Sequence, residues 1–263
     1  MTDLARYEGR HRVRGSIYLA VAMSLLAALV IWIYPSFADS FDDIDEEFLQ
    51  AYPPEVINLF GIQTMASLEG FLAFELYIFG WVILLGLYLA YLGAGTVADD
   101  VERGRIEITL AMPISRARVV AEKYAALFVP IAAVNLLVPV VVYVSAYLVD
   151  EPIDIVDLLA VHALSIPYLF VCAAIGLVAS VAFDRTSIAQ RAALGVVFGL
   201  FMLESLLVGT DFEDVGAIAP MRYFDPNAIL LDSTYDLVDA AVLVVGAIAL
   251  VLAAQLWFRR RDL

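Results

Sequence analysis

Residues 71–95 read FLAFELYIFGWVILLGLYLAYLGAG, a run of mostly apolar side chains in which Glu75 is the one charged residue. About 20 apolar residues in a helix are enough to cross the roughly 30 Å hydrocarbon core of a bilayer. Five other stretches of the chain have the same character. The sequence therefore predicts an all-α membrane protein with six spanning helices, at about 17–37, 71–95, 124–149, 158–183, 192–210 and 239–258.

The basic residues predict the orientation of these spans. Fourteen of the fifteen lie before the first span or after the second, fourth and sixth, and only Arg222 falls in a loop of the opposite side. Because basic loops stay in the cytoplasm, both termini are expected inside, in a multi-pass protein of the plasma membrane. Residues 38–70 and 211–238 then form extracellular loops. Residues 1–16 are expected to form a cytoplasmic amphipathic helix, with Arg6, Arg10 and Arg14 on one stripe.

The composition excludes several classes of protein. A content of 63% hydrophobic residues with repeated long apolar runs excludes a soluble domain. A membrane β-barrel would instead show alternating strands of about ten residues. The lone cysteine, Cys172, excludes a disulfide framework and a cysteine-based zinc site. The net charge of −15 comes mostly from the outside loops, which indicates a host that lives in high salt. The alternative is an outer surface that recruits cations.

The cytoplasmic segment after the second span, residues 96–123, reads TVADDVERGRIEITLAMPISRARVVAEK. We expect a helix over residues 99–112 with Glu102/Arg105 and Arg103/Glu107 ion pairs. Pro113 should end it, and Ser115 is suited to cap a second helix that leads into the third span. Apolar side chains in a cytoplasmic helix–turn–helix are typical of a surface that docks on a partner. The pattern is equally compatible with a loop that packs beneath its own spans.

Three stretches resemble the ABC-2 type permeases, the six-span membrane subunits of ATP-binding-cassette transporters. The first is residues 97–116, VADDVERGRIEITLAMPISR, which are similar to that family's signature, and the lysine that follows in EKY also fits it. The other two are APMRYFDP at 219–226 and FRRRDL at 258–263, which are similar to two further elements of the family. Arg105 stands where the family has threonine. The positions that match or are conservatively replaced are Asp100, Glu102, Gly104, Ile106, Glu107, Leu110, Pro113, Ile114, Ser115, Arg116 and Lys123.

The resemblance implies an ABC-2 bundle of the type V exporter kind, in which the chain is a non-catalytic permease subunit without cofactor or metal. It implies a separate ATPase chain that docks on residues 96–123, termed here the elbow, and a second permease copy in the lipid membrane. Nucleic acid is not an expected partner. The sequence also argues directly against ATP hydrolysis by this chain. A phosphate-binding P-loop needs Gly-Lys-[Ser/Thr], and the only lysine, Lys123, follows Glu122.

Polar residues inside the spans are candidates for a translocation pathway. Ionised carboxylates in hydrocarbon are costly, so Glu75 and Glu204 should face water, a partner or the bundle interior, and Asn135 raises the same question. A purely structural role is an equally good interpretation of all three. His162, near the outer boundary of its span, is expected to be an interfacial or a hydrogen-bonded histidine rather than a metal ligand. Two other functions stay open: a membrane enzyme that holds magnesium and a diphosphate on Asp99 and Asp100, and an ion-coupled carrier that uses Glu75 and Glu204.

Overall fold

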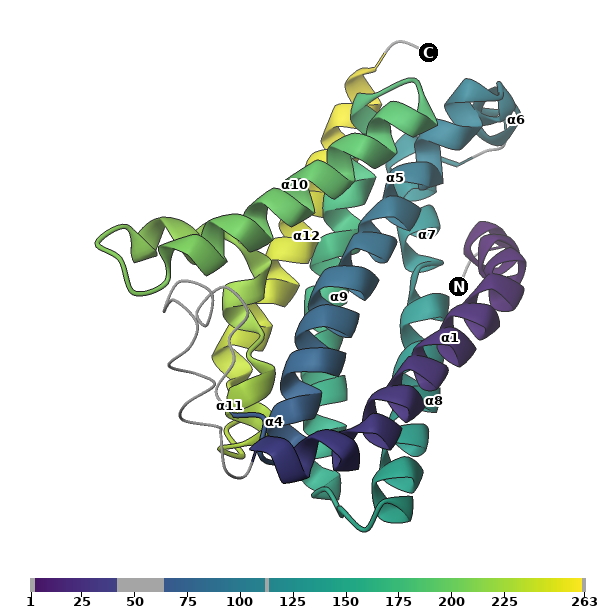
Figure 1. Ribbon diagram of the computed structural model, residues 1–263. Helices are drawn as coiled ribbons and strands as arrows, with labels where there is room; N and C mark the ends of the chain where they lie inside the picture. Colours follow the sequence, from purple (N-terminus) through teal and green to yellow (C-terminus); the bar gives the residue numbers. More distant parts are fainter. Residues whose placement is uncertain (1–2, 42–63, 112–113, 262–263) are drawn as a thin grey trace.

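The computed structural model describes residues 3–41, 64–111 and 114–261, and Figure 1 shows their arrangement. All the regular elements of these residues are helical. They are α1 (Asp3–Phe41), α4 (Leu68–Leu72), the π-helix η1 (Ala73–Leu85), α5 (Gly86–Glu102), α6 (Arg105–Leu110), α7 (Arg116–Ala125), α8 (Phe128–Leu148), α9 (Ile155–Ala182), α10 (Thr186–Leu207), the 3-10 helices η2 (Glu213–Ile218) and η3 (Pro220–Tyr223), α11 (Pro226–Leu230) and α12 (Leu237–Arg260).

Six helical stretches are long and apolar enough to cross a membrane, which confirms the predicted number of spans. Each predicted span overlaps one of them. Most of the predicted extracellular loop 38–70 lies outside the described residues. The stretches are Leu4–Phe37, Leu68–Glu102, Arg116–Leu148, Ile155–Ala182, Thr186–Leu207 and Leu237–Arg260.

The N-terminal residues form one continuous helix with the first span. From Asp3 onward the chain is helical without interruption to Phe41, so the segment expected as an amphipathic helix continues directly into the bilayer helix. Pro35 lies within this helix near its far end. The first turns of α1 lie beside α7, as Figure 1 shows, and the rest of the helix packs along α8.

The core of the bundle is the crossing of α5 and α9. A Cβ atom added to Gly93 would lie 2.2 Å from the carbonyl oxygen of Ala173, and one added to Gly176 would lie 2.1 Å from that of Ala90. Real Cβ atoms do not approach backbone so closely, so only glycine fits at either position. One turn further on, Ser180 Oγ accepts hydrogen bonds from the backbone N–H groups of Val97 (2.8 Å) and Ala98 (2.9 Å).

The other spans are arranged around this crossing. Helix α9 contacts α12, α10 and α8, and α10 also packs on α5, which it crosses obliquely in Figure 1. The buried side chains between these helices are almost all aliphatic or aromatic, with Trp81 and Tyr77 of η1 the largest that are fully buried. Apolar side chains also cover much of the outer surface of α10 and α12, as expected where helices face lipid.

The last predicted outside loop, residues 211–238, is an ordered segment of short helices. Helices η2 and η3 pack on the end of α10, and α11 packs on α9 and η1. The segment is tied to α9 at Asp157, whose two carboxylate oxygens accept hydrogen bonds from Ser233 Oγ (3.0 Å) and from the hydroxyl of Tyr235. This hydrogen bond raises the pKa of the Tyr235 phenol above its ordinary value.

The predicted orientation can be tested with an impermeant thiol reagent in intact cells. We expect single cysteines at exposed Asp154 and Asp214 to react, because both positions belong to segments predicted outside. A cysteine at exposed Arg185 should react only after the cells are opened. The unsubstituted chain is the control, since its Cys172 is fully buried. Labelling of position 185 in sealed cells would contradict the topology.

Candidate functional site

The elbow begins with a break in the helix. Helix α5 ends at Glu102, Gly104 takes a left-handed conformation at φ 65°, and α6 starts at Arg105. The expected continuous helix over 99–112 is therefore wrong. A glycine just past a helix end adopts positive φ without the steric cost that a side chain would add, and so favours termination there. The expected capping of the second helix is confirmed, since Ser115 Oγ accepts from the backbone N–H of Arg118 at 3.3 Å.

Ion pairs at the break join residues other than those predicted. Arg103 Nε lies 2.7 Å from Asp99 Oδ1, and Arg105 contacts the carboxylates of both Asp99 and Asp100. The side chains of Arg103 and Arg105 are 64% and 49% exposed, so each contact contributes little to stability. Arg103 reaches Asp99 at the ordinary four-residue spacing of a helix, whereas Arg105 lies beyond Gly104 and reaches back to the acids of the last turns of α5.

Lys123 is the most buried charged residue of the elbow. Its side chain is 3% exposed, and its Nζ lies 2.6 Å from Glu8 Oε1 and 2.7 Å from Asp100 Oδ2. The two carboxylates come from α1 and α5, whereas the lysine is on α7, so one ammonium group joins three helices. A buried charge that loses its partners is strongly destabilising, and this contact therefore fixes how the three helices meet.

Side chains of the elbow also cap the ends of other helices. Glu122 Oε2 accepts from the backbone N–H of Ala5 in the first turn of α1 (3.1 Å), and Glu102 Oε2 accepts from that of Thr186 at the start of α10 (2.9 Å). Both carboxylates lie where a helix has free N–H groups and a positive dipole end.

Arg116 binds the C-terminus of a helix, whereas the two glutamates bind helix N-termini. Its guanidinium donates to the carbonyl oxygens of Phe258 (3.5 Å) and Arg261, at the C-terminus of α12, and lies over the Phe258 ring. Arg261 in turn donates to Val181 O (2.7 Å) and pairs with Asp184 at the end of α9. The elbow thus contacts the predicted cytoplasmic ends of α1, α10 and α12.

The remaining predicted residues of the elbow divide between interior and surface. Ile106 is 3% exposed and packs with Val119, Val120 and Phe258, which anchors α6 to the bundle. Glu107 is exposed. Ile114 is partly buried against the same apolar cluster. The side chain of Leu110 and the whole of Pro113 lie outside what the structure describes.

Sequence reasoning missed Glu8, Glu122, Asp184 and Arg261 as parts of this site. Each is a charged residue of a segment predicted to be cytoplasmic, and nothing local distinguishes it from a solvated charge. Glu122 directly precedes the only lysine, and that adjacency is the one signal in the sequence that points to it.

Asn135 belongs to a closed hydrogen-bonded cluster inside the bundle. Its Oδ1 lies 3.2 Å from His162 Nδ1 and accepts from Ser165 Oγ at 3.2 Å. The other ring nitrogen of His162 lies 3.2 Å from the hydroxyl of Tyr77, and Trp81 Nε1 donates to Ser165 at 3.0 Å. Buried polar groups that pair with one another in this way hold helices η1, α8 and α9 together.

The two glutamates of the spans lie in different settings. Glu75 is half-buried in η1. Glu204 is buried near the C-terminal end of α10, where its Oε2 lies 3.9 Å from Arg222 Nη1 and accepts no hydrogen bond from any described residue. Gly216 of η2 packs directly against this carboxylate, since a Cβ atom added to Gly216 would lie 1.8 Å from Glu204 Oε2. Arg222, the one basic residue predicted outside, also donates to Glu213 O at 2.6 Å and so fastens η2 to η3.

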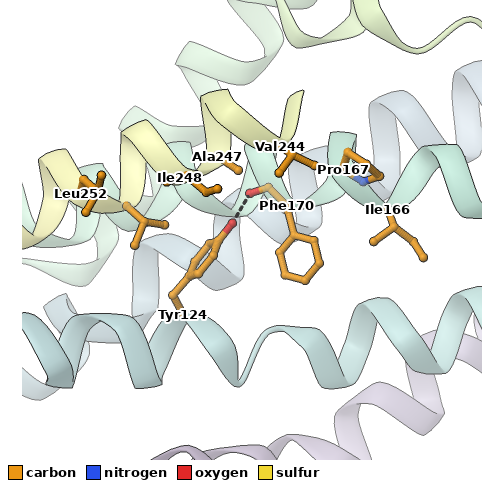
Figure 2. Close-up of a pocket in the computed structure, with 9 residues that line it drawn as sticks. Tyr124, Ile166, Pro167, Phe170, Val244, Ala247, Ile248 and Leu252 are labelled. Atoms are coloured by element: carbon orange, nitrogen blue, oxygen red, sulfur yellow. Dashed lines mark hydrogen bonds between the residues drawn. The ribbon is translucent and has the colours of Figure 1, made fainter. Parts of the chain in front are cut away.

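An apolar cavity of about 430 Å³ lies between α9 and α12, with Tyr124 of α7 at one side (Figure 2). Its one hydroxyl is already used, since Tyr124 donates to Phe170 O at 2.8 Å. The cavity suits hydrocarbon rather than a polar cofactor. It is lined by Tyr124, Ile166, Pro167, Phe170, Val244, Ala247, Ile248, Val251 and Leu252.

Comparison with known proteins gives one finding of similarity. A family model described as "ABC-2 family transporter protein" matches residues 3–263, nearly the whole chain. None of the curated proteins matches the sequence.

The role of Lys123 can be tested by replacement with methionine, which keeps the length of the side chain. We expect Lys123→Met to lower the free energy of unfolding by about 3–5 kcal/mol, because Glu8 and Asp100 lose their shared counter-charge. Denaturant titration of the purified protein in mixed micelles measures the loss. The control is Arg103→Gln, which removes a largely exposed ion pair and should cost about 1 kcal/mol or less. Equal losses would contradict a special role for Lys123.

Proposed function

The chain belongs to the ABC-2 family of transporter proteins, and on that basis we propose that it is the permease subunit of an ATP-driven exporter whose energy comes from a separate ATPase chain. The observation that carries the proposal is the build of the elbow. One cytoplasmic segment presents exposed charged side chains to a partner and is bonded at the same time to the ends of three spanning helices.

The exposed part of the elbow suits a docked protein partner. Glu102, Arg103, Arg105 and Glu107 are exposed around the turn at Gly104, and they present both signs of charge. Such groups set orientation and association rate at an interface. Because Ile106 anchors α6 in the apolar cluster beneath, a partner that pushes on this surface pushes on the bundle itself.

The helix-capping contacts of the elbow would pass its movement on to the spanning helices. Movement of the elbow carries α5 and α7 directly, since they form its two arms. It reaches α10 through Glu102, α1 through Glu122 and Lys123, and α12 through Arg116. A helix cap typically contributes about 0.5–2 kcal/mol, so the elbow and these helix ends favour moving as one body. Rocking of such bodies is the general physical solution for opening a pathway alternately to the two sides.

The proposal includes a second copy of the chain in contact with α10. Among the described residues, a Cβ atom added to Gly195 or Gly199 would meet nothing within 4 Å, so this small-residue face of α10 packs against none of them. Two glycines four residues apart let two membrane helices approach closely. Helices α10 and α12 are also the least buried of the six spans.

The two alternative functions have less support. Asp99 and Asp100, which a magnesium-dependent enzyme would use, are paired with Arg103, Arg105 and Lys123. A carboxylate neutralised by a nearby cation binds a metal ion weakly. For a carrier, Glu204 lies beneath η2 beside Arg222 and Glu75 is in η1, so they occupy separate environments.

Docking of the ATPase can be tested by charge reversal at Glu107. We expect Glu107→Lys to abolish co-purification with the cognate ATPase, because a reversed charge at a docked interface costs several kcal/mol. Membrane insertion should be unchanged, since the residue is exposed at the elbow. The matched control is Glu151→Lys, an exposed glutamate of the predicted outer side. Full ATPase binding by Glu107→Lys would count against the elbow as the docking surface.

Association of two copies can be tested on α10. We expect Gly195→Leu and Gly199→Leu to shift the protein toward the monomer in detergent, as measured by analytical ultracentrifugation, without loss of thermal stability. Gly246→Leu on α12 is the control, because an added Cβ there also meets nothing within 4 Å. If only the control variant dissociated, the contact between copies would lie on α12 instead.

A further inference from the structure

The first four turns of α1 have two unlike faces. One face lies against the elbow and the start of α8: Ala5 and Ser16 are 3% exposed, and Gly9 packs beside Val129 of α8. On the opposite face Arg6, Arg10 and Arg14 are all exposed. Residues four apart on a helix lie one above the next, so the three guanidinium groups form a single basic stripe along the outer side of α1.

The stripe arginines differ from five other arginines of the described residues, which lie against acidic side chains. Arg103, Arg105, Arg118, Arg222 and Arg261 each form an ion pair with an acidic side chain. Among the residues that the structure describes, no ion pair engages Arg6, Arg10 or Arg14. The stripe therefore presents three positive charges to whatever lies outside the first turns of α1.

The position of the stripe relates it to the membrane surface. The apolar part of α1 begins at Ile17, and from there to Phe37 the helix rises about 30 Å at roughly 1.5 Å per residue. This is the thickness of the hydrocarbon core. Arg14 then lies about 5 Å, and Arg6 about 16 Å, beyond the edge of the core along the helix axis.

The side chains around the stripe are those of an interfacial helix. Tyr7 is 59% and Tyr18 74% exposed, and Val13 and Ile17 are also exposed on this side. Aromatic residues with a polar tip gather at the level of the lipid headgroups. An exposed face that combines them with arginines is matched to a surface of negatively charged headgroups above hydrocarbon.

Attraction between the stripe and an anionic membrane surface acts only close to the stripe, because the chain as a whole is negatively charged. The net charge is −15, so an anionic surface repels the protein as a whole. Basic residues near such a surface are nevertheless attracted individually, within a screening length of about 8–10 Å when the salt concentration is about 0.1–0.15 M. The stripe concentrates positive charge at the one place where the helix enters the membrane.

We infer that the exposed face of α1 formed by Tyr7, Tyr18 and the three stripe arginines is a binding surface for anionic phospholipid headgroups of the cytoplasmic leaflet. The opposite face of the same turns is fastened to the elbow through Glu8–Lys123 and Ala5–Glu122. Lipid bound on one face therefore restrains the elbow on the other, and the composition of the leaflet regulates how freely the elbow moves.

The test compares backbone hydrogen exchange in nanodiscs of phosphatidylcholine with that in nanodiscs that also contain phosphatidylglycerol. In the wild-type protein we expect exchange of residues 3–18 to slow by about tenfold or more when the anionic lipid is present. High salt should remove the difference. In Arg6→Gln/Arg10→Gln/Arg14→Gln the difference should vanish, whereas Arg191→Gln/Arg259→Gln/Arg260→Gln, which removes three other exposed arginines, should keep it.

Exchange of residues 116–123 tests the link to the elbow. It should slow together with that of α1 in the wild-type protein and stay unchanged in Glu8→Gln/Glu122→Gln, where the two fastenings are weakened. Equal exchange of α1 in both kinds of nanodisc would overturn the lipid surface and would point to a protein partner for the stripe. No ATPase is present in the experiment, so its result is independent of the proposed transport function.

Discussion

The backbones of α5 and α9 touch where they cross, and the rest of the bundle depends on that contact. Glycine at both sides of the crossing removes the side chains that would otherwise separate the helices. Ser180 then binds two backbone N–H groups of α5 immediately before Asp99. The last turns of α5 are therefore held in place, and the elbow projects from a rigid base. Because α10, α12 and α8 pack on the same pair, the crossing also sets the positions of the other helix ends that the elbow reaches.

Burial separates two kinds of charge in the elbow. Lys123, Asp100 and Glu122 are sheltered, and their contacts specify how α1, α5 and α7 are joined. Arg103, Arg105 and Glu107 are exposed, and their contacts are screened by water and salt. A family signature that spans both kinds thus combines residues that build the elbow with residues that are available to a partner. This division explains why Asp100 and Lys123, expected as coupling residues, lie within the chain rather than on the surface that we propose for docking.

Hydropathy alone predicted the six spans, because a bilayer demands long apolar helices whatever their tertiary packing. The elbow was found through the resemblance of residues 97–116, and Ser115 through local capping rules. The break at Gly104 was also readable in principle, since a glycine after a helical run is a termination signal. Other features depend on residues 80 or more positions apart, such as Glu102 with Thr186 or Tyr77 with His162, and no local pattern encodes those pairs. The π-helical winding of Ala73–Leu85 likewise has no signature in its composition.

The fastening of both ends of the chain to the elbow has a consequence for protein engineering. Ala5 is bound by Glu122 only a few residues from the start of the sequence, and Arg261 is held by Arg116 and Asp184 just before its end. A purification tag or fluorescent fusion joined next to Ala5 or Arg261 is therefore attached almost directly to the elbow, the segment that we propose to move. An internal insertion site is the better choice for a reporter, and the exposed turn at Asp150–Glu151, where the chain already adopts positive φ, lies at the opposite end of α8 from the elbow.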